Sequence, residues 1–269
     1  MNLKKWTHTI YSRLKDKFKG GISEHFRYNV EISKDGHLNI NLQALENASR
    51  IRIDIGLSHN APNSLAWLKR DAEIRVIGIE ANRYNIKCLL QRLSDENIHD
   101  SSIEARFGLL YCAIDDTPIP KYTEFYHITG DPGTSSLLTP TAELLEKNSY
   151  RIREKSAVPV LALSEILEML NWEKIKYIEV CKVDTQGKDL DVIRSAKNYL
   201  SRIAIVIAEV NTWGQYIGAA TEFDITHFMI SNGFSIHNYV YAKNGKASDI
   251  VFVNRKYQPQ VKSVLHEFN

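Results

Sequence analysis

The sequence feature that most constrains the fold is residues 51–82, IRIDIGLSHNAPNSLAWLKRDAEIRVIGIEAN. The segment opens with a β-branched run that ends at Gly56, which is typical of a buried strand entering a tight turn. Pro62 suits the first turn of a helix, because that position needs no backbone donor. A second short strand follows and ends at Glu80. Strand, helix and strand in this order predict a βαβ unit of an open, mostly parallel α/β sheet.

The same segment indicates a nucleoside-containing ligand. Gly56 admits a ligand close to the backbone, and Glu80, 24 positions later, can accept hydrogen bonds from both ribose hydroxyls. Only one glycine is present and Asn60 stands where another is expected, so a pyrophosphate cradle is not predicted. Asp54 could hold an ammonium group, and free backbone N–H groups could hold a carboxylate, which fits S-adenosylmethionine. The alternative is that Asp54 and Gly56 only end a strand and Glu80 only caps the next helix.

Composition limits the other classes of function. The 269 residues are 43% hydrophobic and 25% charged, which is ordinary for one large α/β domain with additions. A net charge of +2 gives no strong case for a nucleic-acid partner. Cys88, Cys112 and Cys181 are too few and too scattered for a disulfide framework or a zinc site, and we predict no metal. There is no membrane-spanning stretch or secretory signal, so we expect a cytoplasmic protein.

The N-terminal residues differ from the rest in charge. Residues 1–19 carry six basic side chains against one acid, with apolar residues at helical spacing, and therefore predict a basic amphipathic helix. We expect it to pack on the body of the protein or on another subunit of a homo-oligomer; the alternative is an anionic membrane surface, here the inner membrane. Residues 26–42 predict a β-hairpin with its turn at 34–36. We therefore divide the chain into an extension, residues 1–48, and a ligand-binding domain, residues 49–269.

The remaining elements continue the α/β pattern. We expect a third strand at 103–113, a strand at 122–128, a short extended segment at 158–161, strands at 175–184 and 203–210, and a closing hairpin from 234–242 and 250–253. Helices are expected after Glu80, at 163–170, from about 188 to about 200, and at 223–231. Asp115, Asp184 and Glu209 then stand at the carboxyl ends of strands, where ligands bind in open α/β sheets. The turn-rich residues 129–136 are a candidate cover for that site.

Several separated motifs resemble the FkbM family of methyltransferases. Asp54-Ile55-Gly56 is similar to the family's first motif, although Asn60 replaces a usual glycine. Glu80-Ala81-Asn82 is similar to its adenosyl-ribose segment, and Gly133-Thr-Ser-Ser-Leu137 to its serine-rich loop. Lys182-Val-Asp184-Thr-Gln186-Gly187 resembles its lysine, aspartate, glutamate and glycine signature, with Gln186 in place of the glutamate. The resemblance also includes residues 158–167, and it covers roughly residues 50–253.

The resemblance implies a class I methyltransferase with a Rossmann-like fold, S-adenosyl-L-methionine as cofactor, and O-methyl transfer to a sugar, glycan precursor or secondary metabolite. Asp184 is our first candidate for the base that takes the hydroxyl proton, with Glu209 and His127 as alternatives; Asp184 could equally cap the following helix. The cofactor candidates are Asp54, Gly56, Ser58, His59, Asn60, Glu80, Ala81, Asn82 and Asp115. The acceptor candidates are Gly133, Ser135, Ser136 and Lys182.

Two other functions fit parts of the pattern. One is a catalytically silent binding or assembly protein that keeps the fold, which the departures at Asn60 and Gln186 would allow. The other is an NAD-dependent oxidoreductase, which the missing glycines disfavour.

Overall fold

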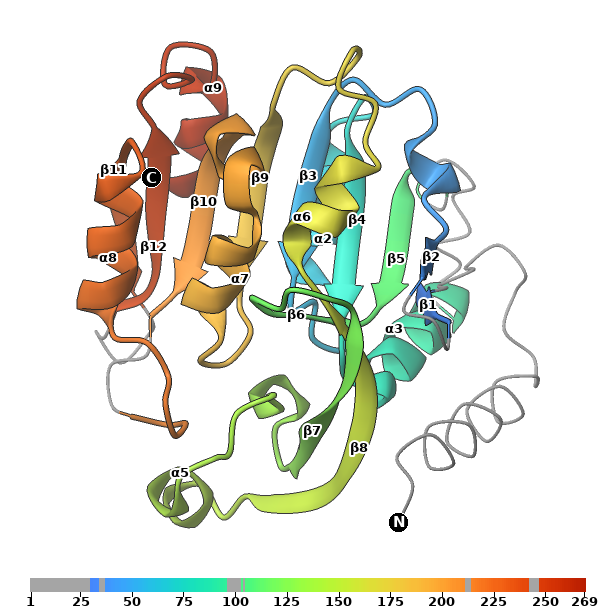
Figure 1. Ribbon diagram of the computed structural model, residues 1–269, viewed down its shortest axis with the longest axis vertical. Helices are drawn as coiled ribbons and strands as arrows, with labels where there is room; N and C mark the ends of the chain where they lie inside the picture. Colours follow the sequence, from blue (N-terminus) through green and yellow to red (C-terminus); the bar gives the residue numbers. More distant parts are fainter. Residues whose placement is uncertain (1–29, 34–36, 96–102, 104, 211–213, 242–246) are drawn as a thin grey trace.

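The structure is a computed structural model that describes residues 30–33, 37–95, 103, 105–210, 214–241 and 247–269 (Figure 1). The helix expected over residues 1–19 and the turn at 34–36 lie outside the described residues. The predicted hairpin is formed by β1 (Val30–Ile32) and β2 (Leu38–Ile40), which pair antiparallel. Val30 and Ile40 are buried in the main hydrophobic core, so the hairpin packs on the body of the protein.

A seven-stranded sheet forms the centre of the described structure, in the order β11-β12-β10-β9-β3-β4-β5. The strands from β10 to β5 are parallel to their neighbours, whereas β12 is antiparallel to both β10 and β11. This is the mostly parallel sheet with a closing antiparallel hairpin that the sequence predicted. The strands span Ile51–Ile55 (β3), Arg75–Glu80 (β4), Phe107–Tyr111 (β5), Ile178–Val183 (β9), Ile203–Glu209 (β10), Phe234–Tyr241 (β11) and Ala247–Asn254 (β12).

Helices cover both faces of this sheet, which explains why β3 and β9 are buried along their whole length. One face packs on α2 (Pro62–Arg70), α3 (Arg83–Asp95) and α9 (Lys262–Leu265). The other packs on α6 (Leu163–Glu168), α7 (Asp189–Ser195) and α8 (Glu222–Ser231) (Figure 1). Short 3₁₀ helices span Gln43–Leu45 (η1), Lys197–Arg202 (η3) and His266–Phe268 (η4).

A second, three-stranded sheet extends beyond the carboxyl ends of the parallel strands (Figure 1). Its order is β6-β8-β7, with β8 antiparallel to β7 and parallel to β6. Its elements are β6 (Ala113–Ile114), β7 (Lys121–Thr129), η2 (Pro132–Thr134), α5 (Ala142–Lys147) and β8 (Arg151–Leu161). The sheet and its connections stand over the edge where the predicted site residues lie.

Three sequence-based boundaries need correction. The single strand expected at 103–113 is divided between β5 and β6, which belong to different sheets. The short segment expected at 158–161 is an 11-residue strand, β8, whose first half is solvent-exposed and charged and so lacks an apolar pattern. The helix expected to about residue 200 ends at Ser195 and continues only as η3, because Lys197 adopts a left-handed conformation with φ of 51°.

A buried ion-pair network joins the C-terminal segment to the sheet. Arg52 on β3 is only 2% exposed, and its guanidinium lies 2.9 Å and 3.0 Å from the two carboxylate oxygens of Glu267. Arg52 also contacts Glu179 on β9 at 3.2 Å. Burial of a charge is costly unless it is paired, so these contacts make Arg52 a structural residue at the sheet edge opposite the predicted site.

Candidate functional site

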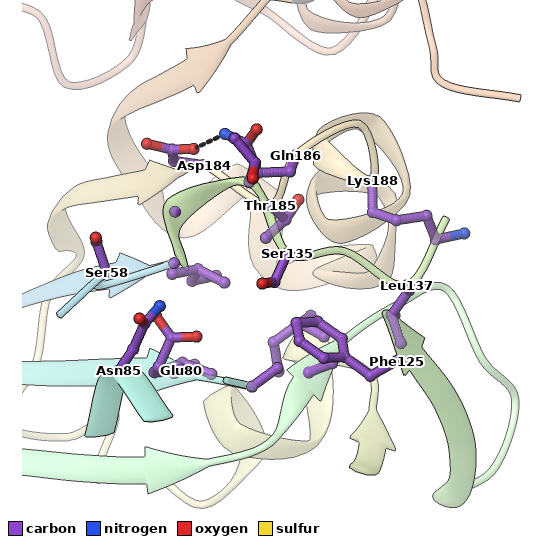
Figure 2. Close-up of a pocket in the computed structure, with 18 of the residues that line it drawn as sticks. Ser58, Glu80, Asn85, Phe125, Ser135, Leu137, Asp184, Thr185, Gln186 and Lys188 are labelled. Carbon is purple, nitrogen blue, oxygen red and sulfur yellow. Dashed lines mark hydrogen bonds between the residues drawn. The ribbon is translucent and has the colours of Figure 1, made fainter. Parts of the chain in front are cut away.

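A cavity of about 400 Å³ lies at the carboxyl ends of β3, β4, β9 and β10 (Figure 2). Its walls include eight of the predicted site residues: Gly56, Ser58, Glu80, Ala81, Gly133, Ser135, Asp184 and Glu209. The sheet edge supplies one wall, and residues 131–137 supply the facing wall. This arrangement is the crevice in which open α/β sheets bind ligands.

Gly56 is required by the protein itself as well as by any ligand. Its φ is 86°, and a Cβ built on it would lie 1.8 Å from the backbone oxygen of Asp184. The glycine therefore allows the ends of β3 and β9 to approach each other, and this contact sets the position of Asp184. From the sequence we expected Gly56 to admit a ligand or to end a strand, and neither role includes this contact.

Asp54 lies beneath the cavity and does not line it. Its Oδ2 accepts hydrogen bonds from the backbone N (3.1 Å) and Oγ (2.7 Å) of Ser64 in the first turn of α2. Burial raises the pKa of this carboxyl group. Asp54 thus fixes α2 to the end of β3, and its charge acts on Lys182 behind the cavity wall.

Glu80 is a buried carboxyl group on the cavity wall. It is 6% exposed, and its Oε1 accepts a 2.6 Å hydrogen bond from the backbone N of Asn82. Burial raises its pKa to about 7, and hydrogen bonds from Asn82, Asn85 and Ser58 offset this only in part. A carboxylate has about four acceptor positions, so Glu80 can still accept hydrogen bonds from a ligand.

The opposite end of the cavity carries Asp184 and Glu209. Lys182 Nζ lies 2.9 Å from Asp184 Oδ2, and Gln186 Nε2 donates to Asp184 Oδ1 (2.8 Å) and to Glu209 Oε2 (2.7 Å). Desolvation and the Asp184 charge raise the pKa of Glu209 well above its usual value. Burial alone would lower the pKa of Lys182, but Asp184 and Asp54 outweigh it and the pKa is raised. Asp184, paired with the Lys182 ammonium group, is therefore the stronger candidate for the base.

Asp184 does not have the helix-capping role that we considered, because α7 begins after Lys188 and has no side-chain hydrogen bond at its N-cap. The backbone N–H groups of Thr185 and Gly187 donate to the Asp189 carboxylate at 3.0 Å and 3.1 Å. Asp189 is buried, and burial raises its pKa to about 7. The carboxylate of Asp184 remains on the cavity wall (Figure 2).

Residues 131–137 form the facing wall and are fixed by their serines. Ser135 Oγ accepts hydrogen bonds from Asn82 Nδ2 and from the backbone N of Ile128, both at 3.1 Å. Ser136 is fully buried, and its Oγ donates to the backbone oxygen of Gln186 at 2.8 Å. Ser135 therefore faces the cavity, whereas Ser136 joins this wall to the turn after β9.

The other predicted site residues lie off the cavity. His59 is exposed and contacts Ser58 Oγ, and Asn60 is half-buried outside the lining. Asp115 forms a 2.7 Å ion pair with Lys188. His127 is 1% exposed and contacts Asn82 Oδ1 (3.2 Å) and Ser156 Oγ (2.7 Å); burial lowers its pKa to about 4. Lys182 and Asn82 contact lining residues from behind.

Our sequence reasoning did not select several lining residues as site residues. They are Asn85, Phe125, Asp131, Leu137, Thr185, Gln186, Lys188 and Gln215. Thr185 and Gln186 follow Asp184 directly, which is a signal in the sequence. Phe125 and Gln215 come from segments whose approach to the sheet edge is a tertiary feature, so no local pattern marks them.

The lining residues are compatible with a nucleoside cofactor that carries an amino-acid end. Thr185 Oγ1 is buried on the cavity wall without a hydrogen-bond partner among the described residues, as expected of a group reserved for a ligand. Ile79, Ala81, Phe125 and Leu137 supply apolar surface for a base. Among the described residues, no group of three or more His, Cys, Asp or Glu side chains could hold a metal ion. None of the described helices is long and apolar enough to cross a membrane.

Comparison with known proteins identifies one family and several similar solved structures. Residues 52–237 match the family described as the methyltransferase FkbM domain. Similar solved structures include a methyltransferase FkbM from Methylobacillus flagellatus KT, with 14% identity and a TM-score of 0.47. The match covers 77% of this chain and 44% of that one. Others are a methyltransferase from Geobacter sulfurreducens (16%, 0.37, covering 80% of this chain and 75% of that one) and a SAM-dependent methyltransferase from Aquifex aeolicus (9%, 0.37, covering 76% and 81%). No curated protein matches the sequence.

Proposed function

Because the chain belongs to the FkbM family of methyltransferases, we propose that it transfers a methyl group from S-adenosylmethionine to a hydroxyl oxygen. Its fold is the class I methyltransferase fold, α/β with a mostly parallel central sheet. The acceptors that we propose are sugars, glycan precursors or secondary metabolites. The observation that supports the proposal most strongly is that Glu80 and Asp184 line the same cavity from different strands.

Glu80, Asn85 and Thr185 would hold the cofactor. The Glu80 carboxylate would accept hydrogen bonds from the ribose hydroxyls, and Thr185 Oγ1 would gain the partner it lacks. The cofactor supplies a methyl group activated by its bond to a sulfonium sulfur. Asp131, Gly133 and Ser135 on the facing wall, rather than the buried Ser136 or Lys182, would then contact the acceptor.

Asp184 would be the general base. As the acceptor oxygen bonds to the methyl carbon and the carbon–sulfur bond breaks, the hydroxyl proton passes to the Asp184 carboxylate. Lys182 Nζ lies 2.9 Å from this carboxylate and holds it in place on the cavity wall. Burial and the neighbouring Asp184 raise the pKa of Glu209, which disfavours the carboxylate form that a base needs.

The alternatives keep different parts of the site. A silent binding protein would hold the cofactor without turnover. An oxidoreductase would need a pyrophosphate cradle, but the turn after β3 has Gly56 alone, and that glycine is closed against Asp184. We further propose a cytoplasmic protein without a nucleic-acid partner, whose residues 1–19 serve assembly or contact with the membrane surface.

Transfer of an isotope-labelled methyl group to a panel of sugar acceptors tests the proposal. We expect a labelled acceptor with the wild type. Asp184→Asn should lose about a hundredfold to ten-thousandfold in rate and keep its affinity for S-adenosylhomocysteine. Glu209→Gln is the matched control and should retain most of the rate. Undiminished turnover by Asp184→Asn would remove Asp184 from the chemistry, and binding of NAD without S-adenosylhomocysteine would favour the oxidoreductase.

A further inference from the structure

Gln186 occupies an unusual position between the acids and the facing wall. It follows β9 in a left-handed conformation with φ of 58°, which is uncommon for a residue other than glycine, and its side chain turns back toward the cavity (Figure 2). It is buried, at 9% exposure. Such a conformation persists where surrounding contacts determine it.

The amide nitrogen separates two acids. Both of its hydrogens are used, one toward Asp184 Oδ1 (2.8 Å) and one toward Glu209 Oε2 (2.7 Å). Because carboxylate oxygens accept and an amide NH₂ donates, these two contacts fix the orientation of the amide. The amide therefore keeps two carboxyl groups on the same cavity wall without direct contact between them.

The amide oxygen and the backbone of Gln186 contact the facing wall. Tyr216 OH lies 3.0 Å from Gln186 Oε1 and 2.6 Å from the backbone oxygen of Thr134. The Gln186 backbone oxygen accepts the hydrogen bond from Ser136. Gln186 thus contacts the carboxyl groups of Asp184 and Glu209 on one side. On the other side it contacts Ser136, which belongs to residues 131–137, and Tyr216, which holds those residues at Thr134.

We propose that Gln186 is a positioning residue for methyl transfer, whose amide sets the Asp184 and Glu209 carboxyl groups and ties them to the wall at Thr134 through Tyr216. The inference rests on the proposed function, because it gives Asp184 the role of base. The amide nitrogen of Gln186 must donate two hydrogen bonds, and its amide oxygen must accept one. A glutamate of the same shape donates nothing when it is ionised and donates only one hydrogen bond when it is protonated.

This requirement gives a pH signature. In Gln186→Glu, three carboxyl groups would meet at one point. Other charged groups also act there on the pKa values of two neighbours: Lys182, Asp189 and Asp249 act on Glu209, and Asp131 acts on Tyr216. Like charges this close cannot all ionise, so a shared proton would replace the amide hydrogen at low pH and be lost at high pH. Gln186→Met has a similar shape without hydrogen bonds and has no proton to lose.

The experiment measures S-adenosylhomocysteine affinity from pH 6.0 to 8.5, each variant relative to the wild type at the same pH. We expect Gln186→Glu to lie within about threefold of the wild type at pH 6.0 and to fall by about tenfold or more by pH 8.5. Gln186→Met should lose a constant factor. The proposal is overturned if Gln186→Glu matches the wild type throughout, or if it loses the same factor at every pH.

Hydrogen exchange of residues 131–137 in the cofactor-free protein gives an independent readout. Tyr216→Phe is the milder variant, because it removes the hydroxyl that contacts Thr134 and Gln186 Oε1 but keeps both hydrogen bonds that the Gln186 amide nitrogen donates. We expect residues 131–137 to exchange faster in Tyr216→Phe and in Gln186→Met than in the wild type. In Gln186→Glu, the excess over the wild-type exchange rate at the same pH should grow with pH. Unchanged exchange in all three would overturn the proposal even if the cofactor binds. If the wild type does not bind S-adenosylhomocysteine, the proposed function fails, while exchange still decides whether Gln186 positions the wall.

Discussion

Replacement of Glu80 by Gln should change both the strength and the pH dependence of cofactor binding. The carboxyl group is 6% exposed and burial raises its pKa to about 7, so it is half protonated near neutral pH in the free protein. If ribose hydroxyls bind to the carboxylate, cofactor binding below pH 7 must release this proton. Wild-type affinity for S-adenosylhomocysteine should then fall by about tenfold from pH 8 to pH 6.

The same geometry sets the loss expected at high pH. A hydrogen bond to a charged group contributes on the order of 1.5 to 3 kcal/mol, so Glu80→Gln should weaken binding about 10- to 150-fold at pH 8. Its affinity should vary little between pH 6 and pH 8, because the titrating group is gone. Isothermal titration calorimetry at several pH values measures both effects. Glu73→Gln, which changes an exposed carboxyl group beyond the opposite end of β4, is the control.

Stability gives a check with the opposite sign. The folded-state pKa of Glu80 is raised above the usual value of 4.5, so the native state holds more protons than the unfolded state between pH 4.5 and pH 7. The contribution of Glu80 to the free energy of unfolding is therefore present below pH 4.5 and is lost as the pH rises toward 7 and above, by up to about 1.4 kcal/mol per unit. Equal pH dependence of cofactor affinity in wild type and Glu80→Gln would refute this reasoning.

Three further predictions concern folding and assembly. Gly56→Ala should lower the free energy of unfolding by at least about 2 kcal/mol in denaturant titrations. The control is Gly218→Ala, because Gly218 has a φ of 81° but no atom within 4 Å of an added Cβ, and its loss should be smaller. Equal losses would contradict the contact with Asp184. Arg52→Ala should cost about 3 kcal/mol, the low end for a broken buried ion pair, because Glu179 and Glu267 keep only the more exposed Arg50 and Arg70 as partners. Arg70→Ala removes a partner of Glu267 that is 58% exposed and should cost no more than about 1 kcal/mol. Similar thermal shifts in the two variants would contradict a buried network. Deletion of residues 1–19 should leave S-adenosylhomocysteine affinity unchanged but alter oligomer size or liposome sedimentation. If neither changes, we would conclude that residues 1–19 pack on the body of the protein.

The sequence predicted the parallel sheet because its strands are buried on both faces. Short runs rich in isoleucine and valine, such as β3 and β10, carry that signal without help from tertiary contacts. The first half of β8 carries no such signal, since Arg151, Arg153 and Lys155 are exposed and this half pairs with β7. Patterns of burial therefore define the central sheet and miss the sheet that stands over the site.

The site shows the same division. Glu80 and Asp184 could be located because each follows a core strand, and strand ends are visible in the sequence. The network at Gln186 could not, because Tyr216 and Thr134 reach it from distant segments. Asp54 and Ser136 occur within motifs, yet their side chains hold α2 and the facing wall and do not line the cavity. A motif identifies a neighbourhood, and packing decides which of its side chains face the ligand.

The most direct test of the central claim is a crystal structure of the wild-type protein with S-adenosylhomocysteine. The account predicts that the ligand fills the cavity at the carboxyl ends of β3, β4 and β9, with its ribose hydroxyls within hydrogen-bond distance of Glu80. Its sulfur should face Asp184, with room between them for an acceptor hydroxyl. A ligand bound elsewhere, or an Asp184 carboxylate more than one bridging water from every acceptor position near the sulfur, would contradict the account.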